Sequence, residues 1–246
     1  MEEVQERAIA WVIADTETTG LTGPACEIAL REICPDSLES LGEIHSLIDP
    51  ECEIEPGAEA IHGITQAMVA SAPTLDEFLT QPGYLDGAFD GRDIVLICHN
   101  ASFDYKRLHM IGNVVSSICT LFHSRQLIPK PSEVPDHKLG TLRAHFGFPL
   151  NEAHRAMDDV DTTHRLLIEL MGRTSRTLRD FHATMDTTVH RMPWGKHAGQ
   201  LMLQLPPDYM LWLWALADLE PNLRNSLEKA MKALGVAKPK KLKAAA

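Results

Sequence analysis

The sequence predicts a mixed α/β fold in which a central sheet is flanked by helices and is followed by a small C-terminal domain. Apolar, strand-like runs lie at 9–14, 26–33, 43–48, 93–98 and, less clearly, 116–120. Helical patterns lie at 65–70, 74–80, 102–110, 121–127, 137–146 and from 154 to about 170. Because the polar link 34–42 is typical of a hairpin turn, the first three strands are expected to be antiparallel.

Length and composition favour a folded protein of one medium domain and one small one. The chain has 246 residues, of which 44% are hydrophobic. No apolar run approaches the ~20 residues that a membrane helix needs, and the charged start MEEVQER is unlike a secretory signal. The five cysteines form no CxxC pair. Free thiols of this kind indicate a reducing compartment, so we expect a cytoplasmic protein without a membrane partner.

The net charge of −11 argues against a general coat for nucleic acid, because proteins that bind phosphates tightly usually carry a basic surface. Metal ions at a carboxylate cluster supply positive charge that the formal count omits. The composition therefore disfavours tight, nonspecific duplex binding but is compatible with a metal-dependent nuclease.

The most informative stretch is the apolar run Ile9–Ala14, which is followed at once by Asp15 and Glu17. Residues i and i+2 of a strand point to the same face, so these carboxylates lie ~6–7 Å apart at the Cα level. They repel each other unless a cation lies between them, and oxygen ligands suit Mg²⁺ or Mn²⁺. The alternative is a solvated Asp-x-Glu at a strand end, followed by an ordinary turn.

Two further segments supply acids to the same region. Asp104 lies in the first turn of a helix that follows the strand 93–98, with Ser102 as the expected N-cap. Asp159 lies at the start of a later helix, five residues after His154. Five residues turn a helix by ~140°, so His154 can share a site with Asp159 only from the preceding loop. Such a mobile histidine suits a proton carrier, and the four acids suit a two-metal site for phosphoryl chemistry.

These segments resemble the three motifs of the DEDDh 3′-to-5′ exonucleases, a family of the ribonuclease H-like superfamily. DTETTGL is similar to the first motif, HNASFD to the second and HRAMDD to the third, in the family's order and over residues 9–171. The segments WGKHAG and PPDYMLWLW are similar to the C-terminal part of some members. The resemblance implies a ribonuclease H-like fold, and stepwise hydrolysis of nucleic acid from a free 3′ end to nucleoside 5′-monophosphates, with two Mg²⁺ ions that Mn²⁺ can replace.

Residue roles follow from the same resemblance. Asp15, Glu17 and Asp159 would hold the first metal. Asp15 would also contact the second metal, with Asp104 reaching it directly or through water, and His154 would be the general base. The resemblance places six residues at the terminal nucleotides: Thr16, Thr18, Leu21, His62, Asn100 and Phe103. Leu30, Arg31 and the insert 82–91 depart from the family pattern outside the motifs, which leaves the substrate preference open.

The expected organisation is a catalytic domain at 1–172, a linker at 173–190, an accessory domain at 191–236 and a basic tail at 237–246. In the accessory domain, Trp194, Tyr209, Trp212 and Trp214 are expected to form a small core. The alternative is that Trp194 or Lys196 contacts nucleic acid.

DNA is the favoured substrate, and three other functions remain open. The first is an exoribonuclease of the ribonuclease T or oligoribonuclease type. The second is a polymerase-associated proofreading subunit, which should lack the WGK and PPDY segments. The third is a non-catalytic nucleic-acid-binding module, which should have lost at least one of the five site residues, whereas all five are present.

Overall fold

The computed structural model describes residues 8–130, 132–149, 155–184, 192, 194–198, 200–216 and 218–237. His154 and all of the expected tail after 237 therefore lie outside the described residues. The chain divides into two compact units, Met1–Phe181 and His182–Ala246, which are described separately. Among the described residues, no helix has the length and apolar character that crossing a membrane requires.

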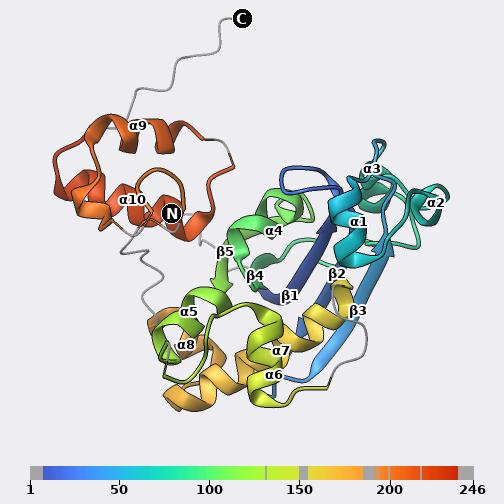
Figure 1. Ribbon diagram of the computed structural model, residues 1–246, viewed down its shortest axis with the longest axis horizontal. Helices are drawn as coiled ribbons and strands as arrows, with labels where there is room; N and C mark the ends of the chain where they lie inside the picture. The colour runs from blue at the N-terminus through green and yellow to red at the C-terminus, as the bar shows by residue number, and fades with distance from the viewer. Residues whose placement is uncertain are drawn as a thin grey trace, which may run out of the picture. The chain divides into compact units, whose positions relative to one another are not determined.

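The first unit is built on one five-stranded sheet with the order β3-β2-β1-β4-β5 (Figure 1). Its strands are β1 (Ile9–Thr18), β2 (Ala25–Ile33), β3 (Ser40–Leu47), β4 (Asp93–Cys98) and β5 (Asn113–Cys119). β1 pairs antiparallel with β2, and β2 with β3, whereas β1–β4 and β4–β5 are parallel. The mixed α/β fold and its antiparallel opening are thereby confirmed.

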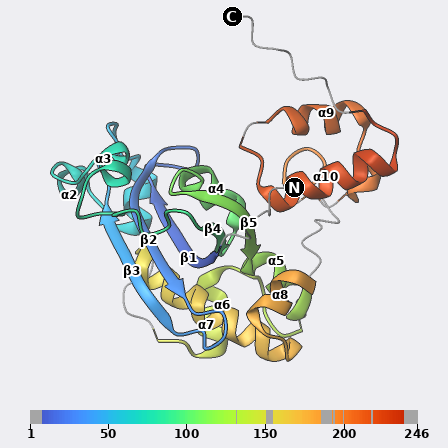
Figure 2. The ribbon, with the colours of Figure 1, turned by 180° about the vertical axis from the view of Figure 1, so that it is seen from behind.

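Helices cover both faces of this sheet (Figures 1 and 2). They are α1 (Pro56–His62), α2 (Gln66–Val69), α3 (Leu75–Thr80), α4 (Ala101–Leu108), α5 (Thr120–Leu127), α6 (Leu139–Phe146), α7 (Ala156–Thr174) and α8 (Leu178–Thr184). On one face, Val12 and Leu96 pack with Phe78 of α3 and Leu108 of α4. On the other, α7 packs against β1 and β2, and α5 packs against β4 and α7.

β1 is the central strand, and its residues from Ala10 to Ala14 are buried, as expected for a strand covered on both faces. The strand does not end at Ala14 but continues to Thr18. It does so because β2 remains paired beside it, with Asp15 opposite Ala29 and Glu17 opposite Glu27. The two acids are therefore held by the regular geometry of a strand, not by that of a turn.

The helix starts show where local signals succeed and where they fail. Thr65 and Thr74 are N-caps, as predicted, and each side chain accepts a hydrogen bond from the backbone N–H three residues on. Ser102 is not an N-cap, and that prediction was wrong. Asn100 takes the position, with a left-handed backbone at φ 79° and ψ 54°. Asn tolerates this conformation better than most residues, so the N-cap of α4 lies two residues earlier than expected.

The helix α1 was not predicted. α1 starts at Pro56 and ends before Gly63, whose φ of 70° favours glycine. His62 is its one buried residue, so the segment carries no apolar stripe that a helical pattern could show.

The expected linker 173–190 requires correction in its first part. α7 continues to Thr174, and α8 lies wholly within the expected linker. Phe181 of α8 is fully buried, and its ring lies 4.9 Å from that of His123 on α5. The chain therefore still packs on the first unit up to Phe181, where the division between the two units falls.

The second unit has a small core of its own. Its elements are a 3₁₀ turn (Met202–Gln204), α9 (Pro207–Ala215) and α10 (Pro221–Ala233). Met210 and Leu213 of α9 pack with Leu223 and Leu227 of α10. Trp194, Tyr209 and Trp214 pack against this core. Trp212 differs from the expectation, because its side chain is 49% exposed.

Candidate active site

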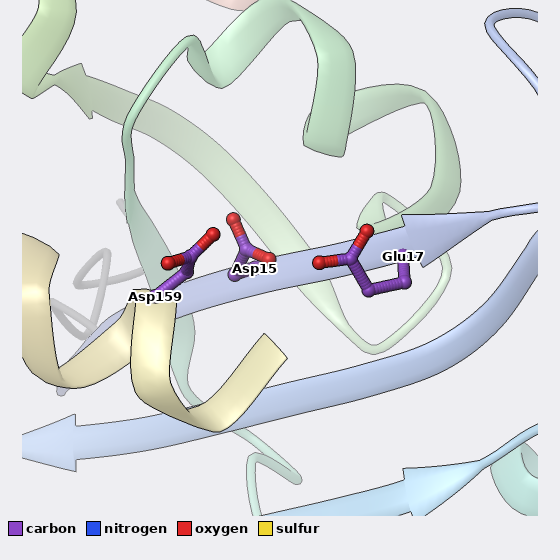
Figure 3. Close-up of side chains that lie close together, drawn as sticks. All are labelled: Asp15, Glu17 and Asp159. Atoms are coloured by element: carbon purple, nitrogen blue, oxygen red, sulfur yellow. The ribbon is translucent and has the colours of Figure 1, made fainter. Parts of the chain in front are cut away.

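Three carboxylates from two distant segments converge in the first unit. Asp15 and Glu17 project from β1, and Asp159 projects from the first turn of α7 (Figure 3). One oxygen from each lies within 4.8 Å of the others. The i, i+2 geometry predicted from DTET thus holds two of the acids, and the packing of α7 against β1 brings in the third.

These acids carry a strong electrostatic conflict. Burial, followed by the charges of Asp104 and Asp159, raises the pKa of Asp15 well above its ordinary value. Burial, with Asp159 as the next cause, raises the pKa of Glu17 to about 8. Converging oxygens that repel one another in a desolvated site form a ligand set for a hard divalent cation, whose charge removes the conflict. The residues present therefore fit a divalent metal.

Asp104 lies beside this cluster but is held differently. It is 2% exposed, and its Oδ1 accepts hydrogen bonds from the backbone N–H of Thr16 at 3.1 Å and from the Thr16 hydroxyl at 2.9 Å. Burial raises the pKa of Asp104 to about 7, whereas the bonds from Thr16 act in the opposite direction. Thr16, expected at the substrate, is buried and orients Asp104.

Glu27 is a buried acid of the site that the sequence reasoning did not single out. It faces Glu17 across the β1–β2 pair and has no exposed surface. Its carboxylate lies 2.6 Å from Arg155 Nη2 and 2.8 Å from His45 Nε2, and it accepts a bond from the Ala156 N–H at 2.9 Å. Burial opposes ionisation, but these hydrogen bonds outweigh it and lower the pKa of Glu27 to about 2.

A sequence signal for Glu27 did exist. The strand CEIALREI places an acid among apolar residues, and an acid inside such a strand needs a partner. Arg155, directly after His154, is that partner. The pairing depends on the β1–β2 register and on where α7 lies, neither of which a single strand pattern contains.

The turn that follows β1 is braced from two sides. The Thr18 hydroxyl donates to the Gly20 carbonyl at 2.8 Å. Arg107 of α4 donates to the carbonyls of Leu21 and Gly23, at 3.3 Å and 2.9 Å. The side chain of Leu21 is nonetheless 86% exposed. A fixed backbone thus presents an apolar side chain to solvent next to the acids.

The other residues expected at the substrate have different environments. His62 is 6% exposed; its Nδ1 accepts from the Ile64 N–H at 3.0 Å, so its Nε2 can donate to the Thr18 carbonyl at 3.2 Å. Asn100 is exposed at the start of α4. The ring of Phe103 lies 4.1 Å from the Arg107 guanidinium. His62 therefore supports the turn after β1, while the Asn100 side chain is accessible.

His154 lies outside the described residues, so its expected role remains a prediction. The described chain resumes at Arg155, which Glu27 holds to the sheet. Arg155 itself is therefore anchored to β2, the strand that pairs with β1 at Glu17.

A family comparison agrees with the fold and the acid cluster. A family model described as "Exonuclease" matches residues 12–167, the span that carries all three motifs. The chain therefore belongs to this exonuclease family, and the DEDDh 3′-to-5′ exonuclease class predicted from the motifs is confirmed. The mixed sheet is of the ribonuclease H-like type.

Individual relatives share more than the motifs. The chain is 32% identical to "Exodeoxyribonuclease 10" of Escherichia coli over 226 residues, covering 88% of this chain and 96% of that protein. It is 32% identical over 188 residues to a "Putative bifunctional exonuclease/endonuclease protein" of Mycobacterium tuberculosis. That match includes 70% of this chain and 28% of the length of the relative. The structure of Exonuclease X in complex with 5′ overhanging duplex DNA is similar, with a TM-score of 0.55, 28% identity, and coverage of 69% of this chain and 95% of that one.

A second, short match lies in the C-terminal part of the chain. Residues 182–218 match a family model described as "Putative quorum-sensing-regulated virulence factor". This span includes α9 and the WGKHAG and PPDYMLWLW segments. The second unit is thus similar to a module that is defined separately from the exonuclease family.

Proposed function

We propose that this exonuclease removes nucleoside 5′-monophosphates stepwise from the 3′ end of DNA, with two Mg²⁺ ions that Mn²⁺ can replace. The observation that carries the proposal is the convergence of Asp15, Glu17 and Asp159, whose oxygens lie within 4.8 Å of one another. Such ligand sets bind the metal ions used in displacement at phosphorus.

The same residues would define the metal positions. Asp15, Glu17 and Asp159 would hold one ion, and Asp15, with Asp104 directly or through water, would hold the other. Bound there, divalent cations would polarise the phosphodiester and stabilise the negative charge on the attacking and leaving oxygens of an in-line displacement. Thr16 contributes by fixing the Asp104 carboxylate through two hydrogen bonds.

The remaining groups orient the substrate and move a proton. His154 would accept the proton of the attacking water as general base. Leu21, 86% exposed on a braced turn, would lie against the terminal base, with Thr18 near the 3′-OH. Asn100 and Phe103 would flank the terminal nucleotides from α4, while His62 would act by supporting the turn after β1.

DNA is proposed over RNA because of the relatives. The match to Exodeoxyribonuclease 10 extends over 96% of that protein, and the Exonuclease X structure contains DNA. All five cysteines are unpaired thiols, which supports a reducing compartment and hence the cytoplasm as the proposed location.

Product analysis on labelled oligonucleotides tests the proposal. Single-stranded DNA, duplex DNA and matched RNA, each labelled at the 3′ or the 5′ end, are incubated with Mg²⁺, Mn²⁺ or a chelator. We expect mononucleotide release from the 3′ end of DNA with either ion and none with the chelator. Faster degradation of RNA would reassign the substrate, and activity in the chelator would overturn the metal-dependent mechanism.

A matched pair of variants tests the site itself. Asp159→Asn removes one of the three converging carboxylates and should abolish most nucleotide release. Asp158→Asn, in the same turn of α7 and with the same change in charge, should retain it. Nearly wild-type release by Asp159→Asn would refute the assigned site.

A further inference from the structure

The first unit contains a basic cavity that the exonuclease assignment leaves unexplained. It has a volume of about 790 Å³ and is lined by three cations, Arg125, Lys130 and Lys138, with Asp136 as the one lining acid. Residues 1–181 hold 14 Lys and Arg against 29 Asp and Glu, a formal charge of −15. A cluster of cations in so acidic a unit points to an anionic ligand.

The three cations are available to such a ligand. All three side chains are exposed at the rim of the cavity. Within the part of the chain that the structure describes, no ion pair closer than 4.0 Å joins any of them to an acid. Asp136 interacts with Lys130 and Lys138 at longer range, but its carboxylate also accepts a hydrogen bond from the Lys138 backbone N–H at 3.0 Å. The positive charge is therefore only partly compensated.

Two histidines that line the cavity are held by hydrogen bonds. His99 Nδ1 lies 2.9 Å from the Thr120 hydroxyl, and His99 Nε2 lies 2.9 Å from the His137 carbonyl. His137 Nε2 in turn lies 3.0 Å from the Ile128 carbonyl. These bonds tie the end of β4 to the start of α5 and to the segment before α6. The cavity is thus preformed, and the amino ends of α5 and α6 at its wall add partial positive charge.

The sheet register places this cavity next to the acid cluster. Ile13 of β1 pairs with Ile97 of β4; Asp15 follows two residues later on β1, and His99 comes directly after the last residue of β4. Neighbouring strands are ~4.8 Å apart, and residues i and i+2 share a face. The helices on this face are α5 and α7, and α7 carries Asp159. A nucleic-acid strand that runs from the acids across the carboxyl ends of the parallel strands would place its next phosphates at the cavity.

We propose that the cavity bounded by Arg125, Lys130 and Lys138 binds a backbone phosphate of the substrate strand on the 5′ side of the bond that is cut. This inference rests on the proposed nuclease function and adds a subsite to it. The cations would offset the repulsion between the strand and the acidic unit. A dinucleotide has no phosphate beyond the one that is cut, so these cations would increase the affinity for longer substrates only.

Steady-state kinetics on two substrate lengths tests the subsite. The double variant Arg125→Gln/Lys138→Gln removes two charges and keeps the polar stems, and Lys138 caps α6 through its backbone, so the fold should persist. With a long single-stranded oligonucleotide we expect KM to rise about tenfold or more at unchanged kcat, since charge-assisted contacts to phosphate are lost. The slope of log KM against log salt should fall by about 0.7 for each lost phosphate contact. With a dinucleotide, neither KM nor kcat should change.

A control of equal charge makes the result specific. Arg165→Gln/Arg176→Gln removes two exposed cations of the same unit that do not line the cavity. It should alter KM for the long substrate by less than about twofold, as expected for screened charges at a distance. Equal effects of the two double variants, or an equal effect of the cavity variant on the dinucleotide, would overturn the subsite. Nucleotide release by the wild-type protein would still stand in that case, so the two proposals fail separately.

Discussion

Glu27 Oε1 lies 2.6 Å from Arg155 Nη2, and this contact joins the second strand of the sheet to the first residue before α7. The same carboxylate accepts the Ala156 N–H, one of the free backbone donors at the start of that helix. Because Asp159 lies in the first turn of α7, its position relative to Asp15 and Glu17 depends on this anchor. The contact also neutralises a charge that would otherwise face Glu17 directly.

The first prediction concerns the acid stability of this anchor. The pKa of Glu27 is lowered to about 2 in the folded protein, below the 4.5 of a free glutamate. A depressed carboxyl pKa stabilises the fold above the unfolded value, and this contribution disappears as pH falls through the folded value. Glu27→Gln should therefore lose stability on the order of 3 kcal/mol at neutral pH, and this deficit should shrink between about pH 5 and pH 2. Urea unfolding across this range measures both effects.

Glu43→Gln serves as the control for that experiment. Glu43 is a half-exposed acid of β3 that pairs with Arg31 at 2.7 Å. An ion pair of this exposure contributes little, so we expect a loss below about 1 kcal/mol. If Glu27→Gln and Glu43→Gln gave parallel stability curves, the buried pair would not anchor α7.

The second prediction concerns the metal-free protein. The pKa of Glu17 is raised to about 8, so its folded state binds a proton that the unfolded chain has already lost at neutral pH. The resulting stabilisation is complete below the unfolded value near 4.5 and is lost as pH rises through about 8. With a chelator present, wild-type protein should melt at a lower temperature at pH 9 than at pH 6. Glu17→Gln should flatten this dependence.

Divalent cations should restore the thermal stability that the protein loses at higher pH. A cation that binds only the folded state stabilises it by mass action, so Mg²⁺ or Mn²⁺ should raise the wild-type melting temperature most at high pH. Asp159→Asn should reduce this rise. A melting temperature that ignores both cations at every pH would argue against Asp15, Glu17 and Asp159 as a metal site.

The sequence allowed the site to be predicted where local geometry determines it. Asp15 and Glu17 could be paired because the period of a strand places i and i+2 on one face, whatever the rest of the fold. Asp104 and Asp159 could be added because each lies in the first turn of a helix that the sequence pattern indicates, although the N-cap of α4 is Asn100 and not Ser102. The family motifs supplied the order. His154 remains an expectation, since it lies outside the described residues.

The parts that were missed depend on contacts between distant segments. Glu27 and Arg155 are 128 residues apart, and neither a strand nor a helix pattern relates them. The parallel register of β1 with β4, which sets Ile13 opposite Ile97, is likewise absent from any single segment. The sequence predicts a linker where α8 lies, because Phe181 packs against α5, a neighbour that local periodicity cannot reveal.

The third prediction concerns Thr16. Thr16→Val keeps the β-branched shape and the backbone N–H but removes the hydroxyl that donates to Asp104. Because the bonds from Thr16 lower the pKa of Asp104, that pKa should rise above its value of about 7. The acidic limb of the kcat/KM profile should then move to higher pH, and the rate at neutral pH should fall about tenfold, the equivalent of one hydrogen bond to a charged group. An unshifted profile would mean that Thr16 does not control Asp104.

The fourth prediction concerns His154. His154→Ala should lower kcat by about 10²–10⁴, the usual contribution of a general base, while the rise in melting temperature with Mg²⁺ stays as in the wild type. His109→Ala, which alters an exposed histidine at the end of α4, should leave both quantities unchanged. A variant that lacks His154 but keeps the neutral-pH rate would remove this residue as the base. A lost response to Mg²⁺ would instead make it a metal ligand.

The last prediction separates backbone from side-chain function at Asn100. Its φ of 79° lies in the left-handed region, which glycine adopts freely and a β-branched residue resists. Asn100→Gly should therefore keep the wild-type melting temperature, whereas Asn100→Val should lose at least ~1–2 kcal/mol of stability. If the exposed side chain contacts the terminal nucleotides, Asn100→Gly should still raise KM severalfold despite its intact fold. Wild-type kinetics in Asn100→Gly would instead show that asparagine serves only to start α4, and this turn would then contribute Asp104, but not the Asn100 side chain, to the site.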